Sequence, residues 1–170
     1  AGAHGDLNAH IIDMARYLVG EISSVIGMST TFIKERPLPA QESQLSTMLT
    51  ATTGGGMGVV DVDDATAFLA RFENGAIGSF EATRFAGGRK NHNQFEIYGS
   101  MGSMAFDFER MNELQFYSRE EPAYSQGWKT IMVTEADHPY ISHWWPAGHV
   151  IGYENTFVNE YADLLQCIVE

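Results

Sequence analysis

The spacing of hydrophobic residues changes twice along the chain. From Ile11 onward, apolar residues recur every three or four positions until Gly20, which predicts a short helix over residues 8–19. Asp6 and Asn8 precede this segment as candidate N-caps. The same spacing returns near the end of the chain and predicts a closing amphipathic helix through Phe157, Tyr161, Leu164, Leu165 and Ile168.

Between these helices the pattern favours strands. A β-branched segment over residues 24–33, which ends before Pro37, indicates a first strand. Two-residue alternation predicts six more strands, at residues 65–72, 76–85, 95–98, 103–108, 114–117 and 128–133. Asn74-Gly75 and residues 100–103 are turn signals, so neighbouring strands are expected to pair antiparallel. Residues 37–58, rich in Gln, Ser, Thr and Gly, are expected to form a mobile loop.

These elements predict an α+β fold, with a largely antiparallel, open-faced sheet and helices on one face. No internal repeat or linker divides the 170 residues, so residues 1–170 are expected to form one domain. Several strands carry apolar side chains on both faces, and aromatic residues make up 12% of the chain. The open face is therefore expected to join copies of the chain into a homodimer or homotetramer.

Composition narrows the partners and the compartment. The formal net charge of −12 opposes binding to nucleic acid or to an anionic membrane surface. No segment approaches the roughly 20 apolar residues that span a bilayer, and none of the first residues resembles a signal peptide. The single cysteine, Cys167, cannot close an intrachain disulfide, which favours the cytoplasm. The chain lacks an initial Met and stops within a predicted helix, so an excerpt of a longer protein is expected.

The densest group of polar residues surrounds Asp6 and His10 at the start of the first helix. Four residues separate them, which would place both side chains on one side of the helix. A carboxylate that orients an imidazole suits proton transfer to or from a hydroxyl group. The alternative is a simple helix cap beside a hydrogen-bonded histidine.

Metal and phosphate sites fit the sequence less well. His4, Asp6, His10 and Asp13 offer enough donor atoms for zinc or manganese, but their spacing matches no established metal motif, and no metal is predicted. The glycine run at residues 54–58 departs from GxGxxG at Val59 and precedes a strand, so a flexible loop is favoured over a phosphate-binding loop.

Two further groups are candidate substrate contacts. Trp145 and His149 lie in an aromatic loop over residues 138–148 and the residue that follows it, and such side chains suit a sugar pocket. The alternative is that the tryptophans hold the loop against the core. Arg84 and Asn91 belong to a locally basic, amide-rich segment that suits a hydroxylated or anionic ligand, or equally a solvated hairpin end.

The segment from Gly5 to Ile22, GDLNAHIIDMARYLVGEI, resembles the GD-x-x-x-H-x-x-D segment of the glucose-fructose oxidoreductase and inositol dehydrogenase (Gfo/Idh/MocA) family. Further segments resemble the C-terminal domain of that family, in family order: residues 63–72, 73–76, 96–103 and 152–157. The resemblance implies the substrate domain of an NAD(P)-dependent oxidoreductase that oxidises a secondary hydroxyl of a sugar, sugar derivative or cyclitol. It also implies assembly through the open sheet face.

By position, Asp6 and His10 match the Asp and His that work in this family beside a lysine of a Glu-Lys-Pro motif. That motif and the Rossmann fingerprint are absent from these 170 residues, so the NAD or NADP site is expected in an N-terminal Rossmann domain outside this chain, and the chain alone is expected to be inactive. Two other functions compete with this one: a non-catalytic carbohydrate-binding or assembly module, and a metal-dependent isomerase or hydrolase.

Overall fold

The structure is a computed structural model that describes residues 1–39 and 53–170. Contacts divide the chain into two compact units, Ala1–Gly88 and Arg89–Glu170. Among the described residues, no helix is both long and apolar enough to cross a membrane. All strand pairs are antiparallel, which confirms the expected α+β class.

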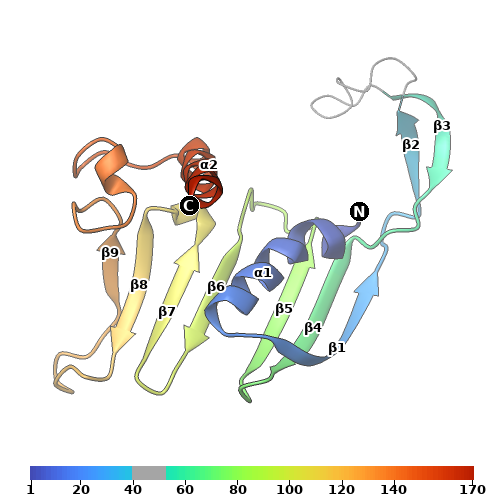
Figure 1. The fold of residues 1–170 in the computed structure, drawn as a ribbon. Helices are drawn as coiled ribbons and strands as arrows, with labels where there is room; N and C mark the ends of the chain where they lie inside the picture. Colours follow the sequence, from blue (N-terminus) through green and yellow to red (C-terminus); the bar gives the residue numbers. More distant parts are fainter. Residues whose placement is uncertain (40–52) are drawn as a thin grey trace. The chain divides into compact units, whose positions relative to one another are not determined.

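The first unit is built on a three-stranded sheet in the order β1-β4-β5 (Figure 1). A π-helical turn, η1, runs directly into helix α1, and this helical segment lies over one face of the sheet. A separate strand pair, β2 and β3, completes the unit. The bounds are η1 His4–Asn8, α1 Ala9–Leu18, β1 Ile22–Thr30, β2 Glu35–Pro39, β3 Thr53–Val59, β4 Ala65–Phe72 and β5 Ile77–Thr83.

The covered face of this sheet carries the core of the unit. Every second residue of β4 points inward, and Ala70 and Phe72 are buried there. Phe68 stacks on Phe80 of β5 with 4.6 Å between ring centroids, and the ring of His4 meets the edge of Phe68 at 6.0 Å. The turn η1 is therefore packed directly on the two strands that lie beneath it.

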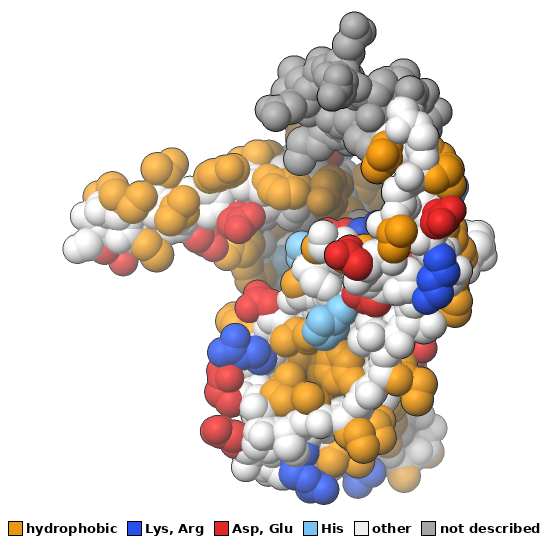
Figure 2. All heavy atoms as spheres, turned by 90° about the vertical axis from the view of Figure 1, so that its right-hand side faces the viewer, with side chains coloured by type: hydrophobic (Ala, Val, Ile, Leu, Met, Phe, Trp, Pro, Cys, Tyr) orange, Lys and Arg blue, Asp and Glu red, His pale blue; other side chains and the backbone are white. Residues whose placement is uncertain are grey.

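The opposite face of the sheet is apolar and exposed. Ile26, Met28, Leu69 and Ile77 are 75%, 78%, 60% and 76% exposed. The register pairs Ile26 with Leu69 in the centre of this face, and a shallow depression of about 470 Å³ lies between β1, β4 and β5. Figure 2, which looks from the side of β1 and the β2–β3 pair, shows hydrophobic side chains at the surface among charged ones. The predicted apolar open face is present in the structure.

The second unit is a four-stranded sheet in the order β6-β7-β8-β9, with helix α2 (Figure 1). A row of aromatic rings connects the sheet to the helix. The ring centroid of Phe108, the residue after β7, lies 5.7 Å from that of Tyr153, the first residue of α2. The side-chain amide of Asn112 both donates to and accepts from the backbone of Ile151 at 2.8 Å. The bounds are β6 Gln94–Tyr98, β7 Gly102–Asp107, η3 Phe108–Arg110, β8 Glu113–Ser118, β9 Lys129–Met132, η4 Ile141–His143 and α2 Tyr153–Val169.

Both predicted turns join paired strands. Gly75 has φ +91° and its N–H donates to the carbonyl of Phe72 at 3.0 Å, which closes the β4–β5 hairpin. Gly99 donates to the carbonyl of Gly102 at 2.8 Å between β6 and β7. The six strands predicted after residue 64 are confirmed, with small shifts at their ends.

Gly102 makes a testable contact at the start of β7. A Cβ atom there would overlap the carbonyl oxygen of Tyr117 on the neighbouring strand. Gly102→Ala is therefore expected to destabilise the protein by about 1–3 kcal/mol, since backbone cannot move aside as a flexible side chain does. Gly127→Ala, where a Cβ meets no atom within 4 Å, is the matched control. Equal unfolding midpoints for the two variants in a thermal melt would contradict the packing of β7 on β8.

The predicted helix over residues 8–19 is confirmed as α1, but the π-helical turn η1 precedes it, so Asp6 lies within helical backbone and is not an N-cap. Helical backbone starts at His4, whose N–H donates to the carboxylate of Asp63 at 2.8 Å. The acceptor for the first helical N–H thus comes from 59 positions away. Asn8 makes no capping hydrogen bond with its side chain either. A long-range contact has replaced the local cap that the spacing favoured.

Two other expectations about local structure were partly wrong. The first strand is shifted to Ile22–Thr30, because the N–H groups of Phe32 and Ile33 donate to a carboxylate and not to a strand. The expected loop over residues 37–58 has strands at both ends, and its glycine run lies within β3. Arg36 pairs with Gly58, where the missing side chain leaves room for Leu38. Residues 40–52 of the expected loop lie outside the described residues.

Candidate active site

Asp6 and His10 lie on consecutive turns of the helical segment of the first unit. Asp6 belongs to η1 and His10 to the first turn of α1. Both side chains are accessible to solvent, with that of Asp6 50% exposed. The contact expected between the carboxylate and the imidazole is not formed, since the described interactions include none between these two residues. Asp6 is instead paired with Arg84.

Asp63 fixes the beginning of η1. Its Oδ2 accepts hydrogen bonds from the N–H of His4 and from the hydroxyl of Thr66, each at 2.8 Å. The carbonyl oxygen of Asp63 also accepts from the N–H of Ala3 at 2.9 Å. A Cβ atom on residue 2 would overlap the Asp63 carboxylate, so the chain can pass this closely only as Gly2. Sequence reasoning missed this role, although residues 63–72 already formed one of the segments that resembled the family.

The hydrogen bond from the His4 backbone, with a smaller contribution from Thr66, lowers the pKa of Asp63 below its usual value. A carboxylate with a lower pKa in the folded state stabilises the fold at neutral pH, and this contribution disappears as the pH falls through the folded pKa. Asp63→Asn is therefore expected to lose less stability than the parent between about pH 6 and about pH 3. Urea unfolding of the parent and the variant across this pH range measures the free energy of unfolding and tests the expectation. Asp61→Asn, which changes an exposed aspartate, is the control. A pH dependence unchanged by Asp63→Asn would contradict it.

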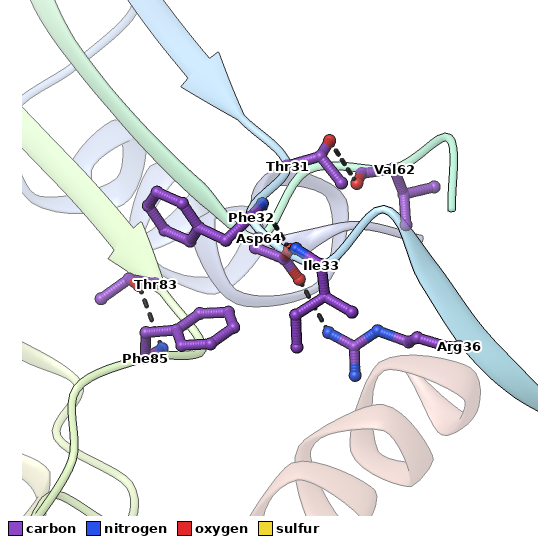
Figure 3. A network of polar contacts seen from close by, with 8 residues as sticks. All are labelled: Thr31, Phe32, Ile33, Arg36, Val62, Asp64, Thr83 and Phe85. Carbon is purple, nitrogen blue, oxygen red and sulfur yellow. Dashed lines mark hydrogen bonds and ion pairs between the residues drawn. The ribbon is translucent and has the colours of Figure 1, made fainter. Parts of the chain in front are cut away.

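Asp64, the next residue, anchors the other side of β4. Its Oδ2 accepts from the N–H groups of Phe32 and Ile33 at 2.8 and 2.9 Å, and its Oδ1 pairs with Arg36 at 2.9 Å (Figure 3). These bonds, led by that from Ile33, lower the pKa of Asp64. The side chain is only 4% exposed, whereas that of Arg36 is 48% exposed. Asp63 thus holds the start of η1, and Asp64 holds residues 32–36, each next to the start of β4.

Asn8 is the most completely buried polar residue close to Asp6. Its side-chain amide nitrogen lies 3.3 Å from Nδ1 of His4, whereas its Oδ1 has no hydrogen-bond partner among the described residues. Asn8 thus lies buried where η1 meets α1, at the N-cap position that the sequence indicated, but its side chain makes no capping hydrogen bond.

The remaining predicted contacts belong to the second unit. Asn91 is exposed in the segment before β6. Trp145 is 73% exposed, and its ring lies 5.5 Å from the ring of His149, whose Nδ1 is 2.8 Å from the carbonyl of Pro146. Trp144 instead donates from Nε1 to Asn159 of α2 at 3.1 Å. One tryptophan therefore holds the loop against the helix, and the other presents its ring to solvent.

The structure brings possible metal ligands together in the second unit, and not at the residues that the sequence offered as ligands. In the part of the chain that the structure describes, possible ligand atoms lie within 4.8 Å of one another only for His92, Asp107 and Glu109. Arg89 pairs with Glu109 there at 3.3 Å, so a cation already occupies part of this group. The donor atoms of His4, Asp6 and His10 do not converge in this way. The geometry therefore gives no support to the metal-dependent alternative.

Comparison with known proteins identifies the family to which this chain belongs. A model of the GFO/IDH/MocA C-terminal domain matches residues 1–105, which include η1, α1 and all strands of the first unit. The chain belongs to the Gfo/Idh/MocA family. The resemblance carried by the segment around Asp6 and His10 is thereby confirmed.

The sequences of individual relatives match all or nearly all of this chain. Levoglucosan dehydrogenase of Pseudarthrobacter phenanthrenivorans is 45% identical over 172 residues, which cover 100% of this chain and 43% of the relative. An oxidoreductase domain protein from Kribbella flavida is 48% identical, with a TM-score of 0.87 over 99% of this chain and 43% of that chain. Levoglucosan dehydrogenase in complex with NADH and levoglucosan is 43% identical, with a TM-score of 0.84 over 99% of this chain and 41% of that chain. This chain thus spans less than half the length of these relatives.

Proposed function

We propose that this chain is the substrate domain of an NAD(P)-dependent dehydrogenase that oxidises a secondary hydroxyl group of a sugar, sugar derivative or cyclitol. The observation that carries the proposal is the position of Asp6 and His10 on consecutive helical turns, of which the first, η1, is held against the sheet by Asp63 and Arg84. The relatives support the proposal, because one structure of 43% identity is levoglucosan dehydrogenase in complex with NADH and levoglucosan.

The glycine run over residues 54–58 does not fit a nucleotide-binding loop. The glycine run lies in strand β3 and does not form a loop before a helix, which is the arrangement that binds a pyrophosphate. In this proposal the nucleotide, NAD or NADP, is bound mainly by a Rossmann domain outside these 170 residues, and it supplies the acceptor for the hydride. This chain alone is then expected to be inactive.

The residues of this chain bind the alcohol and accept its proton. In the proposal His10 accepts the proton of the reacting hydroxyl, directly or by relay, as its oxygen becomes a carbonyl oxygen. Asp6 orients the substrate by accepting a hydrogen bond from a hydroxyl group. Asn91, Trp145 and His149 are proposed as further substrate contacts. The exposed Trp145 ring offers a flat surface for the C–H face of a sugar.

A steady-state assay tests this function on the whole protein that contains the chain. Levoglucosan, glucose and myo-inositol are each offered with NAD or NADP, and reduced nucleotide is followed by absorbance. We expect reduction that depends on both nucleotide and sugar. The second candidate is a non-catalytic carbohydrate-binding or assembly module, favoured by the solvent-exposed ring of Trp145. Sugar binding in calorimetry without any nucleotide reduction would favour that module and contradict the dehydrogenase.

The open sheet face is proposed to join copies of the protein into a homodimer or homotetramer. Leu69 lies at the centre of the exposed apolar face, so Leu69→Lys would place an unpaired charge in the interface. We expect the association constant to fall at least about tenfold, measured by analytical ultracentrifugation. Tyr124→Lys changes a 92% exposed aromatic residue of the second unit and is the control. Unchanged association of the Leu69 variant would contradict an interface on this face.

A further inference from the structure

We infer that Arg84 is a positioning residue of the proposed active site, which holds the carboxylate of Asp6 in place and does not itself bind the substrate. The inference rests on the proposed function and changes the role that the sequence indicated for Arg84. Its starting point is the ion pair between Nη2 of Arg84 and Oδ2 of Asp6, two residues separated by 78 positions.

The backbone around Arg84 is fixed on both sides. The N–H of Arg84 donates to the carbonyl of Asp64 at 3.1 Å, just beyond the end of β5. The next N–H, of Phe85, donates to the hydroxyl of Thr83 at 3.0 Å, and the ring of Phe85 meets the ring of Phe32 edge-on at 5.2 Å. Figure 3 shows Phe32, Thr83 and Phe85 together with the buried Asp64. The guanidinium group therefore extends from a rigid support.

Asp6 lies on a turn that is fixed in the same way. Its N–H donates to the carbonyl of Gly2 at 3.0 Å, and the turn begins where His4 donates to Asp63. The side chain of Asp6 is the movable part, because it is half exposed. The ion pair with Arg84 restricts the orientation of this side chain and connects the turn to the end of β5.

The exposure of this ion pair favours a role in orientation over one in stability. The side chains of Arg84 and Asp6 are 44% and 50% exposed, and exposed pairs contribute little to folding. Arg84 bonds only Oδ2 of Asp6, and Oδ1 accepts no hydrogen bond from any other residue that the structure describes. The ion pair at Oδ2 therefore sets the direction of Oδ1, which has no donor among the described residues. Such an oxygen suits a carboxylate that must accept a hydrogen bond from a substrate hydroxyl.

Kinetics of the whole protein with its best sugar substrate test the inference. Arg84→Gln is expected to lower kcat about 10- to 100-fold and to change KM less than about threefold, because the substrate loses an oriented partner and not a binding contact. Arg84→Lys, which keeps the charge, is expected to recover part of the loss. In an Asp6→Asn background, Arg84→Gln is expected to have less than about a twofold further effect. Arg119→Gln, an exposed arginine of the second unit, is the control.

Other outcomes overturn the inference. An increase of KM by more than about tenfold with kcat unchanged would make Arg84 a substrate contact. Full additivity with Asp6→Asn would show that Arg84 acts through another group. A crystal structure of Arg84→Gln separates this failure from that of the proposed function, because the side chain of Asp6 is expected to lose its single orientation while the backbone of residues 4–10 stays in place, whether or not any sugar is oxidised. An Asp6 side chain that keeps its orientation in this variant would also contradict the inference.

Discussion

Replacement of His10 by alanine is expected to lower kcat of the whole protein by about 10²- to 10⁴-fold, the usual contribution of a positioned proton acceptor. The imidazole lies one helical turn after Asp6 and is open to solvent, so a substrate can reach it. KM is expected to change much less, because the proton moves in the transition state. Initial rates of nucleotide reduction over a range of sugar concentrations measure both constants.

The matching control for this experiment is His138→Ala. His138 lies in the second unit, where its Nδ1 accepts the N–H of Glu135 at 3.0 Å. That variant is expected to keep kcat within about twofold of the parent, since an exposed loop bond contributes little. A His10→Ala enzyme with kcat within about threefold of the parent would remove His10 from the proposed chemistry.

Asp64→Ala is expected to give the largest loss of stability among single substitutions of the first unit. The change removes the acceptor for the N–H groups of Phe32 and Ile33 and the partner of Arg36. Charged acceptors form strong hydrogen bonds, and buried donors without a partner are costly. The midpoint of thermal unfolding is expected to fall by roughly 5 °C or more. Differential scanning calorimetry measures this directly.

Asp61→Ala provides the comparison for Asp64→Ala, three positions earlier on the same segment. Asp61 is exposed, so its loss is expected to shift the midpoint by less than about 2 °C. The loss of the Asp64 side chain is also expected to lower activity, because this side chain fixes the backbone of Phe32, whose ring meets the ring of Phe85 beside Arg84. A melting curve of Asp64→Ala that overlies that of Asp61→Ala would show that the network in Figure 3 carries little stability.

Local signals predicted most of the elements of this fold. Asn74-Gly75 was a sufficient hairpin signal because glycine adopts the positive φ that this turn requires without a Cβ clash, as Gly75 does. The π-helical turn before the first helix was not predicted, because its first N–H is accepted by Asp63, which no local pattern connects with His4. The ends of the expected loop form strands although glycine is rare in strands. The pairing uses backbone groups, which glycine also has, as Gly58 shows by pairing with Arg36.

The candidate site was only partly visible in the sequence. Spacing and resemblance together selected Asp6 and His10, whose roles stay a prediction, whereas the family match confirms the family. Neither could show that Arg84 would reach Asp6, since that contact depends on the place where β5 ends beside η1. The importance of Asp63 was hidden for the same reason, because its partners become neighbours only through the sheet.

A structure of the whole protein with NADH and its sugar substrate is the most direct test of the account. We expect the reacting hydroxyl within about 3 Å of the imidazole of His10, with a second hydroxyl bonded to Asp6. Arg84 is expected to remain paired with Asp6 in that complex. A sugar seated at Trp145 and His149 alone, with His10 out of hydrogen-bond reach of every hydroxyl, would contradict the account.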